Sequence, residues 1–298
     1  MPLLREVLAR DPSSAPALLA LTTTHLRSGD LAGARESALR LVELRPTSPT
    51  AVNRLGTVHF STSDYESAAT AFRRAIALDP RVPRAHFNLG AALLRLGRFE
   101  EARAALEDSI RVEPTSAAYS NLGVSQYLLG RHAEAAGSFQ KAVDLAPKDY
   151  RRHIYLGDAL SQIPGRAAQA RRAYEAALPL ARAELSLDPS DATTVVLLGR
   201  CLARTGEPEK AWAEIRRGVT LAHDDENVLE TAAAAAMLVG KRSEALAWLE
   251  GAVSRGYGLV EIERDPDFAP LRSDPAFKKL ASLAPTATAT PPSTGEKR

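Results

Sequence analysis

A skeleton of small and apolar residues that recurs every 34 positions constrains this 298-residue chain more than any other feature. In its clearest copy, Leu55-Gly56 is followed by Ala68, Phe72 and Pro80. A fixed period of this size indicates an array of repeats. The prolines that close successive copies keep the phase, with spacings of 34, 34, 34 and 33 residues along the series Pro12, Pro46, Pro80, Pro114 and Pro147.

Each copy has the pattern of two short amphipathic helices. Gly56 and Ala68 are small residues at the places where the two helices would cross, and Leu55 and Phe72 fill the space beside the crossing. The closing proline ends the second helix, because the residue before a proline is pushed out of the α region. One copy cannot cover its own apolar face, so neighbouring copies stack and bury a continuous core. The sequence therefore predicts an all-α solenoid.

The skeleton resembles the tetratricopeptide repeat (TPR) consensus, in which W-x2-L-G-x2-Y is followed by A-x3-F and then P. The resemblance implies a right-handed superhelix of about seven helix-turn-helix repeats with a short helical cap at the C-terminal end. The residues that carry this signature are Leu55, Gly56, Ala68, Phe72, Pro80, Leu89, Gly90, Ala102, Pro114, Leu122, Gly123, Ala135, Phe139, Pro147, Gly157, Gly199 and Ala211.

The phase of the skeleton also predicts boundaries. Residues 1–14 match the second helix of a partial repeat, and the array covers 15–257, with repeats near 15–48, 49–82, 83–115, 116–149, 150–191, 192–225 and 226–257. The fifth repeat is longer, so we expect an elongated second helix kinked at Pro179. Residues 258–281 should form a helical cap whose helices start at Asp265-Pro266 and Asp274-Pro275, and the Thr/Pro/Ala-rich stretch 282–298 should be disordered.

Composition argues against several classes of partner. With 38 basic and 36 acidic residues the formal net charge is +2, which gives no case for nucleic acid. No apolar run is long enough for membrane insertion, and the N-terminal residues do not resemble a signal peptide, so we expect a cytoplasmic protein. The one cysteine, Cys201, excludes an internal disulfide.

No set of residues predicts catalysis, a metal site or a cofactor. The six histidines lack metal-ligand spacing, and four of them occupy the aromatic places of the repeat. Cys201 is expected to be a small core residue, since no histidine stands at a supporting distance in the sequence. Phosphate-binding and hydrolase motifs are also missing from the sequence. We therefore predict a protein that is not an enzyme.

The first helices of TPR arrays line a concave groove, so the resemblance implies a peptide-binding surface there. Asn88 and Asn121 directly precede Leu-Gly in adjacent repeats, where an amide can pair with an extended backbone. The carboxylate clamp that holds chaperone tails in some TPR proteins is not expected, because Ala117 stands where a clamp lysine would be. The predicted groove residues are Asn53, Arg84, Asn88, Asn121, Tyr127, Tyr155 and Asp158.

The leading hypothesis is a scaffold or adaptor that binds a protein or peptide segment in this groove. An alternative is a regulatory or sensory C-terminal module of a larger bacterial enzyme of the kinase or sulfatase type. It rests on the stretch 150–280, which resembles the C-terminal TPR regions of bacterial multidomain regulators such as kinases, cyclases and winged-helix proteins. A third hypothesis is self-association through an exposed N-terminal helix.

Overall fold

The computed structural model describes residues 2–283, and within them the regular structure is entirely helical, without a β-strand. The all-α prediction is confirmed. The chain divides into two compact units, unit 1 and unit 2, with the boundary between Ala146 and Pro147. Most of the stretch predicted to be disordered, 284–298, lies outside the described residues.

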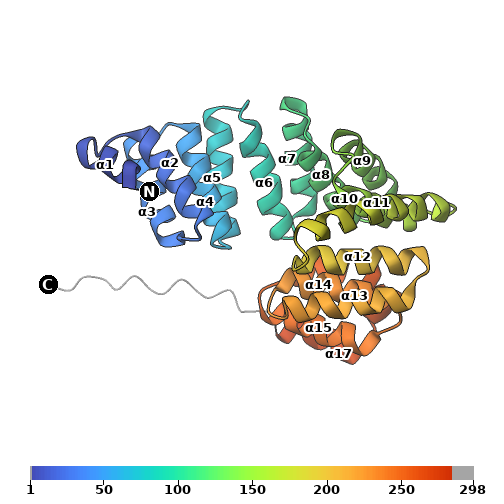
Figure 1. Cartoon of the computed structure of the whole chain (residues 1–298). Coiled ribbons are helices and arrows are strands. Elements are labelled where there is room, and N and C mark those ends of the chain that lie inside the picture. The colour runs from blue at the N-terminus through green and yellow to red at the C-terminus, as the bar shows by residue number, and fades with distance from the viewer. Residues whose placement is uncertain (1, 284–298) are drawn as a thin grey trace. The chain divides into compact units, whose positions relative to one another are not determined.

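Unit 1 consists of antiparallel helix pairs that follow one another in chain order (Figure 1). The first helix of each pair packs on the second helix and also contacts the first helix of the next pair. This face, made by α2, α4, α6 and α8, is called the inner face of unit 1. The helices are α1 (Pro2–Arg10), α2 (Ala15–Arg27), α3 (Leu31–Leu44), α4 (Pro49–Ser61), α5 (Tyr65–Leu78), α6 (Pro83–Arg95), α7 (Phe99–Val112), α8 (Ser116–Leu128) and α9 (His132–Leu145).

Short polar side chains start many of these helices. Asp30, Ser48 and Asp64 each accept a hydrogen bond from a backbone N–H in the first turn of α3, α4 and α5. The turn inside each pair needs a residue with positive φ, and Gly29 supplies it in the first complete repeat. At the equivalent place in the second repeat, Ser63 adopts a φ of 58°, a conformation that costs a non-glycine residue energy.

The helix crossings are as tight as the repeat skeleton predicts. A Cβ atom added to Gly56 would lie 2.6 Å from a ring carbon of Phe72, and one added to Gly123 would lie 2.6 Å from Phe139. In the first complete repeat, Thr22 stands at the position of the crossing glycine, and its hydroxyl donates a hydrogen bond to the Ser37 hydroxyl at 2.9 Å. Small residues at the crossings are therefore a steric requirement.

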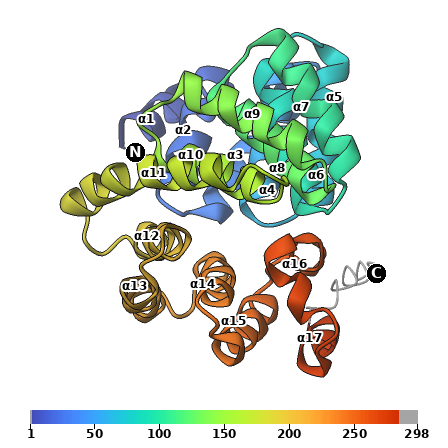
Figure 2. The same cartoon turned by 90° about the vertical axis from the view of Figure 1, so that its right-hand side faces the viewer.

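Unit 2 continues the helix pairs and ends in short helical segments. In Figure 2, where α12 to α15 are seen nearly end-on, α12 and α14 form one layer and α13 and α15 another. The predicted elongated helix is present as α11, which runs for 21 residues with Pro179 inside it. The elements are α10 (Tyr150–Ser161), α11 (Ala167–Leu187), α12 (Ala192–Thr205), α13 (Pro208–Leu221), α14 (Glu226–Leu238), α15 (Arg242–Ser254), α16 (Leu259–Arg264), α17 (Pro275–Lys279) and the 3₁₀ segments η1 (Pro266–Leu271) and η2 (Leu280–Ser282).

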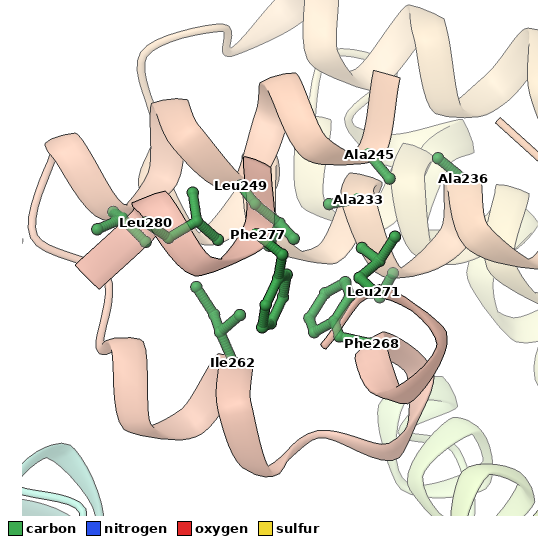
Figure 3. Close-up of a cluster of buried hydrophobic side chains, with 11 residues drawn as sticks. Ala233, Ala236, Ala245, Leu249, Ile262, Phe268, Leu271, Phe277 and Leu280 are labelled. Atoms are coloured by element: carbon green, nitrogen blue, oxygen red, sulfur yellow. The ribbon is translucent and has the colours of Figure 1, made fainter. Parts of the chain in front are cut away.

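The short C-terminal segments cover the last helix pair. Phe268, Leu271, Phe277 and Leu280 are buried in one cluster with residues of α14 and α15 such as Leu249 (Figure 3). The predicted starts are found, because Asp265 and Asp274 accept backbone N–H groups at the beginnings of η1 and α17. These segments, residues 258–282, are called the cap. They bury the apolar surface that the last repeat would otherwise expose.

Candidate functional site

The inner face of unit 1 contains an open hollow of about 710 Å³ between α2 and α4. Its residues combine apolar and small polar side chains with a guanidinium group from α4. The α2 residues were not predicted from the sequence because that repeat is degenerate, although Leu19 stands one period before the predicted groove residue Asn53. The lining residues are Pro16, Leu19, Ala20, Thr23, Thr24, Arg27, Ser28 and Arg54.

Two of the predicted groove asparagines lie side by side on the inner face. The Asn88 side-chain amide donates a hydrogen bond to the Asn53 side-chain oxygen at 3.2 Å, which joins α6 to α4. Asn121 is half-buried on α8 at the repeat position of Asn88. Tyr127, also on α8, packs its ring edge-on against His132, with 5.2 Å between ring centroids.

Charge is distributed unevenly between the two faces of unit 1. The helices α2, α4, α6 and α8 contain no Asp or Glu, whereas they contain the arginines Arg27, Arg54, Arg84 and Arg95. Arg54 is half-buried, its Nε has no hydrogen-bond partner, and burial together with the nearby Arg84 lowers its pKa. Arg95 differs, because its guanidinium lies over the Tyr65 ring and its Nε donates to the Tyr65 hydroxyl at 3.3 Å.

In unit 2 the predicted groove residue Asp158 is engaged inside the chain. Its carboxylate accepts hydrogen bonds from the Tyr174 hydroxyl at 2.7 Å and from Arg200 Nε at 3.2 Å. Arg200 and Arg204 in turn pair with Asp267 of the cap, at 2.5 Å and 2.9 Å. These five residues are called the buried network of unit 2. The carboxylate of Asp158 is thus paired within unit 2.

Two further carboxyl groups border the buried network. Burial and the neighbouring Asp265 raise the pKa of Glu230 to about 8, and burial and Asp267 raise the pKa of Asp265 to about 7. Burial also raises the pKa of Tyr155, another predicted groove residue, which is half-buried on α10. Four carboxyl groups thus share two arginines at the junction of α10, α12, α14 and the cap.

A model of the family described as tetratricopeptide repeat matches residues 2–49, 53–111, 92–150 and 165–226. These segments cover more than half of the chain. The protein belongs to the tetratricopeptide repeat family. The resemblance stated from the repeat skeleton is therefore confirmed.

Solved TPR structures share the fold at low sequence identity. The crystal structure of MamA is 19% identical with a TM-score of 0.51, and the match covers 58% of this chain and 95% of MamA. PilF of Pseudomonas aeruginosa is 22% identical with a TM-score of 0.58, covering 74% and 97%. A TPR protein from Parabacteroides merdae ATCC 43184 is 17% identical with a TM-score of 0.57, covering 91% and 98%. No curated protein matches the sequence.

Two histidines and the single cysteine of this TPR protein have partners or surroundings that fit a role in the fold. The ring nitrogens of His86 and His153 lie 2.8 Å and 2.9 Å from the carbonyl oxygens of Pro80 and Pro147. Cys201 is buried, and burial raises the pKa of its thiol. Within residues 2–283, no cluster of His, Cys, Asp and Glu has the arrangement of a metal site. None of the described helices is long and apolar enough to cross a membrane.

Proposed function

We propose that this TPR protein is a non-enzymatic scaffold that binds a segment of another protein along the inner face of unit 1. TPR arrays are protein-interaction scaffolds, and that general role follows from the family. The finer assignment is carried by the open hollow between α2 and α4, lined by Leu19, Thr23 and Arg54. A concave surface with apolar contacts and a few placed polar groups suits a peptide ligand.

The asparagines of α4, α6 and α8 support a role in reading a peptide backbone. The Asn53–Asn88 hydrogen bond uses one donor and one acceptor site, so each amide keeps further sites for a ligand. The bond also fixes the orientation of both side chains before a ligand arrives, which reduces the entropy lost on binding. Asn121 extends the same row by one repeat.

Phage display of random peptides against the full chain tests the proposal. Enriched peptides are synthesised and titrated against wild type and against two inner-face variants, Ala20→Trp, which fills the hollow, and Asn88→Ala/Asn121→Ala. The matched controls are Thr70→Trp and Gln140→Ala, which alter exposed positions on the second helices α5 and α9. We expect the inner-face variants to weaken binding by about tenfold or more with an unchanged helical circular dichroism spectrum. Equal affinity for all variants would show that the peptides bind elsewhere.

A second interaction surface is proposed on α1. Leu3 is 71% exposed and Val7 is 38% exposed on this helix. We propose that these side chains support self-association. Sedimentation velocity of the wild type and of a Leu3→Lys/Val7→Lys variant measures it, and a wild type that stays monomeric at high concentration would rule it out.

A further inference from the structure

We propose that the inner face of unit 1 selects acidic segments, whose Asp or Glu side chains pair with Arg27, Arg54 and Arg84. This inference rests on the proposed function, because it names the chemistry of the segment that the same face binds. It is carried by the position of these arginines and their missing carboxylate partners, by the partial burial of Arg54, and by a counterpart inside unit 2.

Arg27, Arg54 and Arg84 of the inner face lack the carboxylate partners that several arginines of the second helices have. On α7, Arg103 pairs with Glu100 and Glu107 at 3.1 Å and 2.6 Å. For Arg27, Arg54 and Arg84, in contrast, no carboxylate of residues 2–283 lies within ion-pair distance. The four first helices contain no acidic residue that could supply one.

Arg54 gains the most from an incoming carboxylate. It is half-buried in the wall of the hollow, and its buried Nε–H donates to no acceptor. A donor withdrawn from water without a partner costs free energy that a ligand acceptor recovers. Arg84 is close enough to repel it, so an anion placed between the two guanidinium groups is attracted by both.

In unit 2, an arginine on a first helix already has a carboxylate partner from the same chain. Arg204 lies five residues after the crossing glycine Gly199, as Arg27 does after Thr22, and there it pairs with Asp267. Asp267 belongs to an Asp-Pro-Asp turn of the cap. An acidic segment of this chain thus binds the arginines of α12. In unit 1 the described residues provide no such segment.

A protein segment fits the inner face better than a nucleic acid. Arg27, Arg54 and Arg84 stand out against a net charge of only +2, which is little for a polyanion whose binding depends on many phosphate contacts. The neutral amides Asn53 and Asn88 beside these arginines suit a peptide backbone. The apolar wall at Leu19 leaves room for an uncharged side chain between the acidic ones.

Two fluorescein-labelled peptide pools test the inference by anisotropy titration against the full chain. In one pool every third position is Glu, in the other Gln, and the remaining positions are the same mixture of Ala, Ser, Leu and Phe. The variant is Arg54→Gln/Arg84→Gln. The matched control Arg35→Gln/Arg40→Gln removes the same charge from exposed, unpaired positions of α3.

We expect the Glu pool to bind the wild type about tenfold more tightly than the Gln pool. This preference should disappear in Arg54→Gln/Arg84→Gln, persist in the control, and weaken as NaCl is added. Equal binding of both pools would overturn the acidic selectivity while groove binding stands. Binding of neither pool, together with a phage selection that enriches nothing, would overturn both proposals. A labelled RNA oligonucleotide that binds through the same two arginines would reassign the face to nucleic acid.

Discussion

Arg200 and Asp267 form a buried ion pair across 67 positions of the sequence, with 2.5 Å between a guanidinium nitrogen and a carboxylate oxygen. Their side chains are 8% and 4% exposed. The pair joins α12 to the cap, and Asp158 and Arg204 complete its charge balance.

Replacing Asp267 by Asn should therefore destabilise unit 2 by about 3 kcal/mol, because removing one partner leaves buried guanidinium charge uncompensated. Both tryptophans of the chain, Trp212 and Trp248, lie in unit 2, so urea unfolding followed by tryptophan fluorescence measures the loss. The control Asp274→Asn weakens a more exposed pair with Arg242 and should cost about 0–1 kcal/mol. Equal effects of the two substitutions would contradict a stabilising role of the buried network.

Two glycines of unit 1 should respond oppositely to alanine. Gly123→Ala should cost about 1–3 kcal/mol, because the new Cβ meets Phe139 at the helix crossing. Gly137→Ala on α9 meets nothing within 4 Å and should stabilise by up to about 1 kcal/mol through helix propensity. Thermal unfolding monitored by circular dichroism compares them, and a stabilising Gly123→Ala would mean that the two helices can move apart at little cost.

Ser63→Gly should stabilise unit 1 by about 1 kcal/mol. Ser63 has a φ of 58° at a turn position where other repeats have glycine, and glycine adopts that conformation without the steric cost. Ser61→Gly, two residues earlier at the C-terminal residue of α4, is the control and should not stabilise, with a loss of up to about 0.5 kcal/mol. Chemical unfolding of the wild type and the two variants measures their free energies of unfolding. A loss of stability in both variants would contradict strain at Ser63.

The stability of unit 2 should fall as pH rises from about 4 to about 9. Glu230 and Asp265 have pKa values of about 8 and about 7 in the fold, against ordinary values of 4.5 and 3.8. The folded state therefore holds protons that the unfolded chain has released, and this contribution is complete below the ordinary pKa values and lost through pH 7 to 8. The groups that face them are Tyr155, Asp158, Arg200, Thr231 and Asp267.

Urea unfolding at a series of pH values, read from tryptophan fluorescence, measures this dependence. Glu230→Gln keeps the neutral form at every pH and should flatten the curve. An exposed carboxyl variant, Glu250→Gln, should leave it as in the wild type. A wild-type stability that rises between pH 6 and pH 9 would contradict the prediction.

Cys201 should not react with a thiol reagent in the folded protein, because it is buried and its thiol pKa is raised, which suppresses the nucleophilic thiolate. Ser190→Cys in a Cys201→Ala background places a thiol at an exposed turn and serves as the positive control. Absorbance of the released thionitrobenzoate gives both rates. Equal rates in the native state would show that α12 opens readily, whereas reaction of Cys201 only in denaturant would support the packing described here.

The repeat skeleton was sufficient to predict the fold because each constraint is local. Gly56 and Phe72 meet across one helix pair, so their spacing in sequence reports their contact directly. The same holds for the helix starts at Asp265 and Asp274, where the side chain caps a backbone N–H two residues on. Such signals need no knowledge of the rest of the chain.

The candidate site was harder to predict because its features come from several repeats at once. The hollow lies in a repeat where Thr22 replaces the expected glycine, so Leu19 and Arg27 were not singled out. Asp158 has the right position for a groove residue, but its pairing with Arg200 depends on the next repeat and on the cap. The groove role of Asn53, Arg84, Asn88, Asn121, Tyr127 and Tyr155 stays a proposal.

The tie between α12 and the cap also has a mechanical consequence. In a simple repeat array, a pull on one end peels the units off singly, because each holds only its neighbours. In unit 2 the ion pair between Arg200 and Asp267 joins the cap directly to α12, although the helices α13 to α15 lie between them in sequence. We therefore expect tension applied to the cap to pass through this ion pair directly to α12, so that α13 to α15 are protected until the pair breaks.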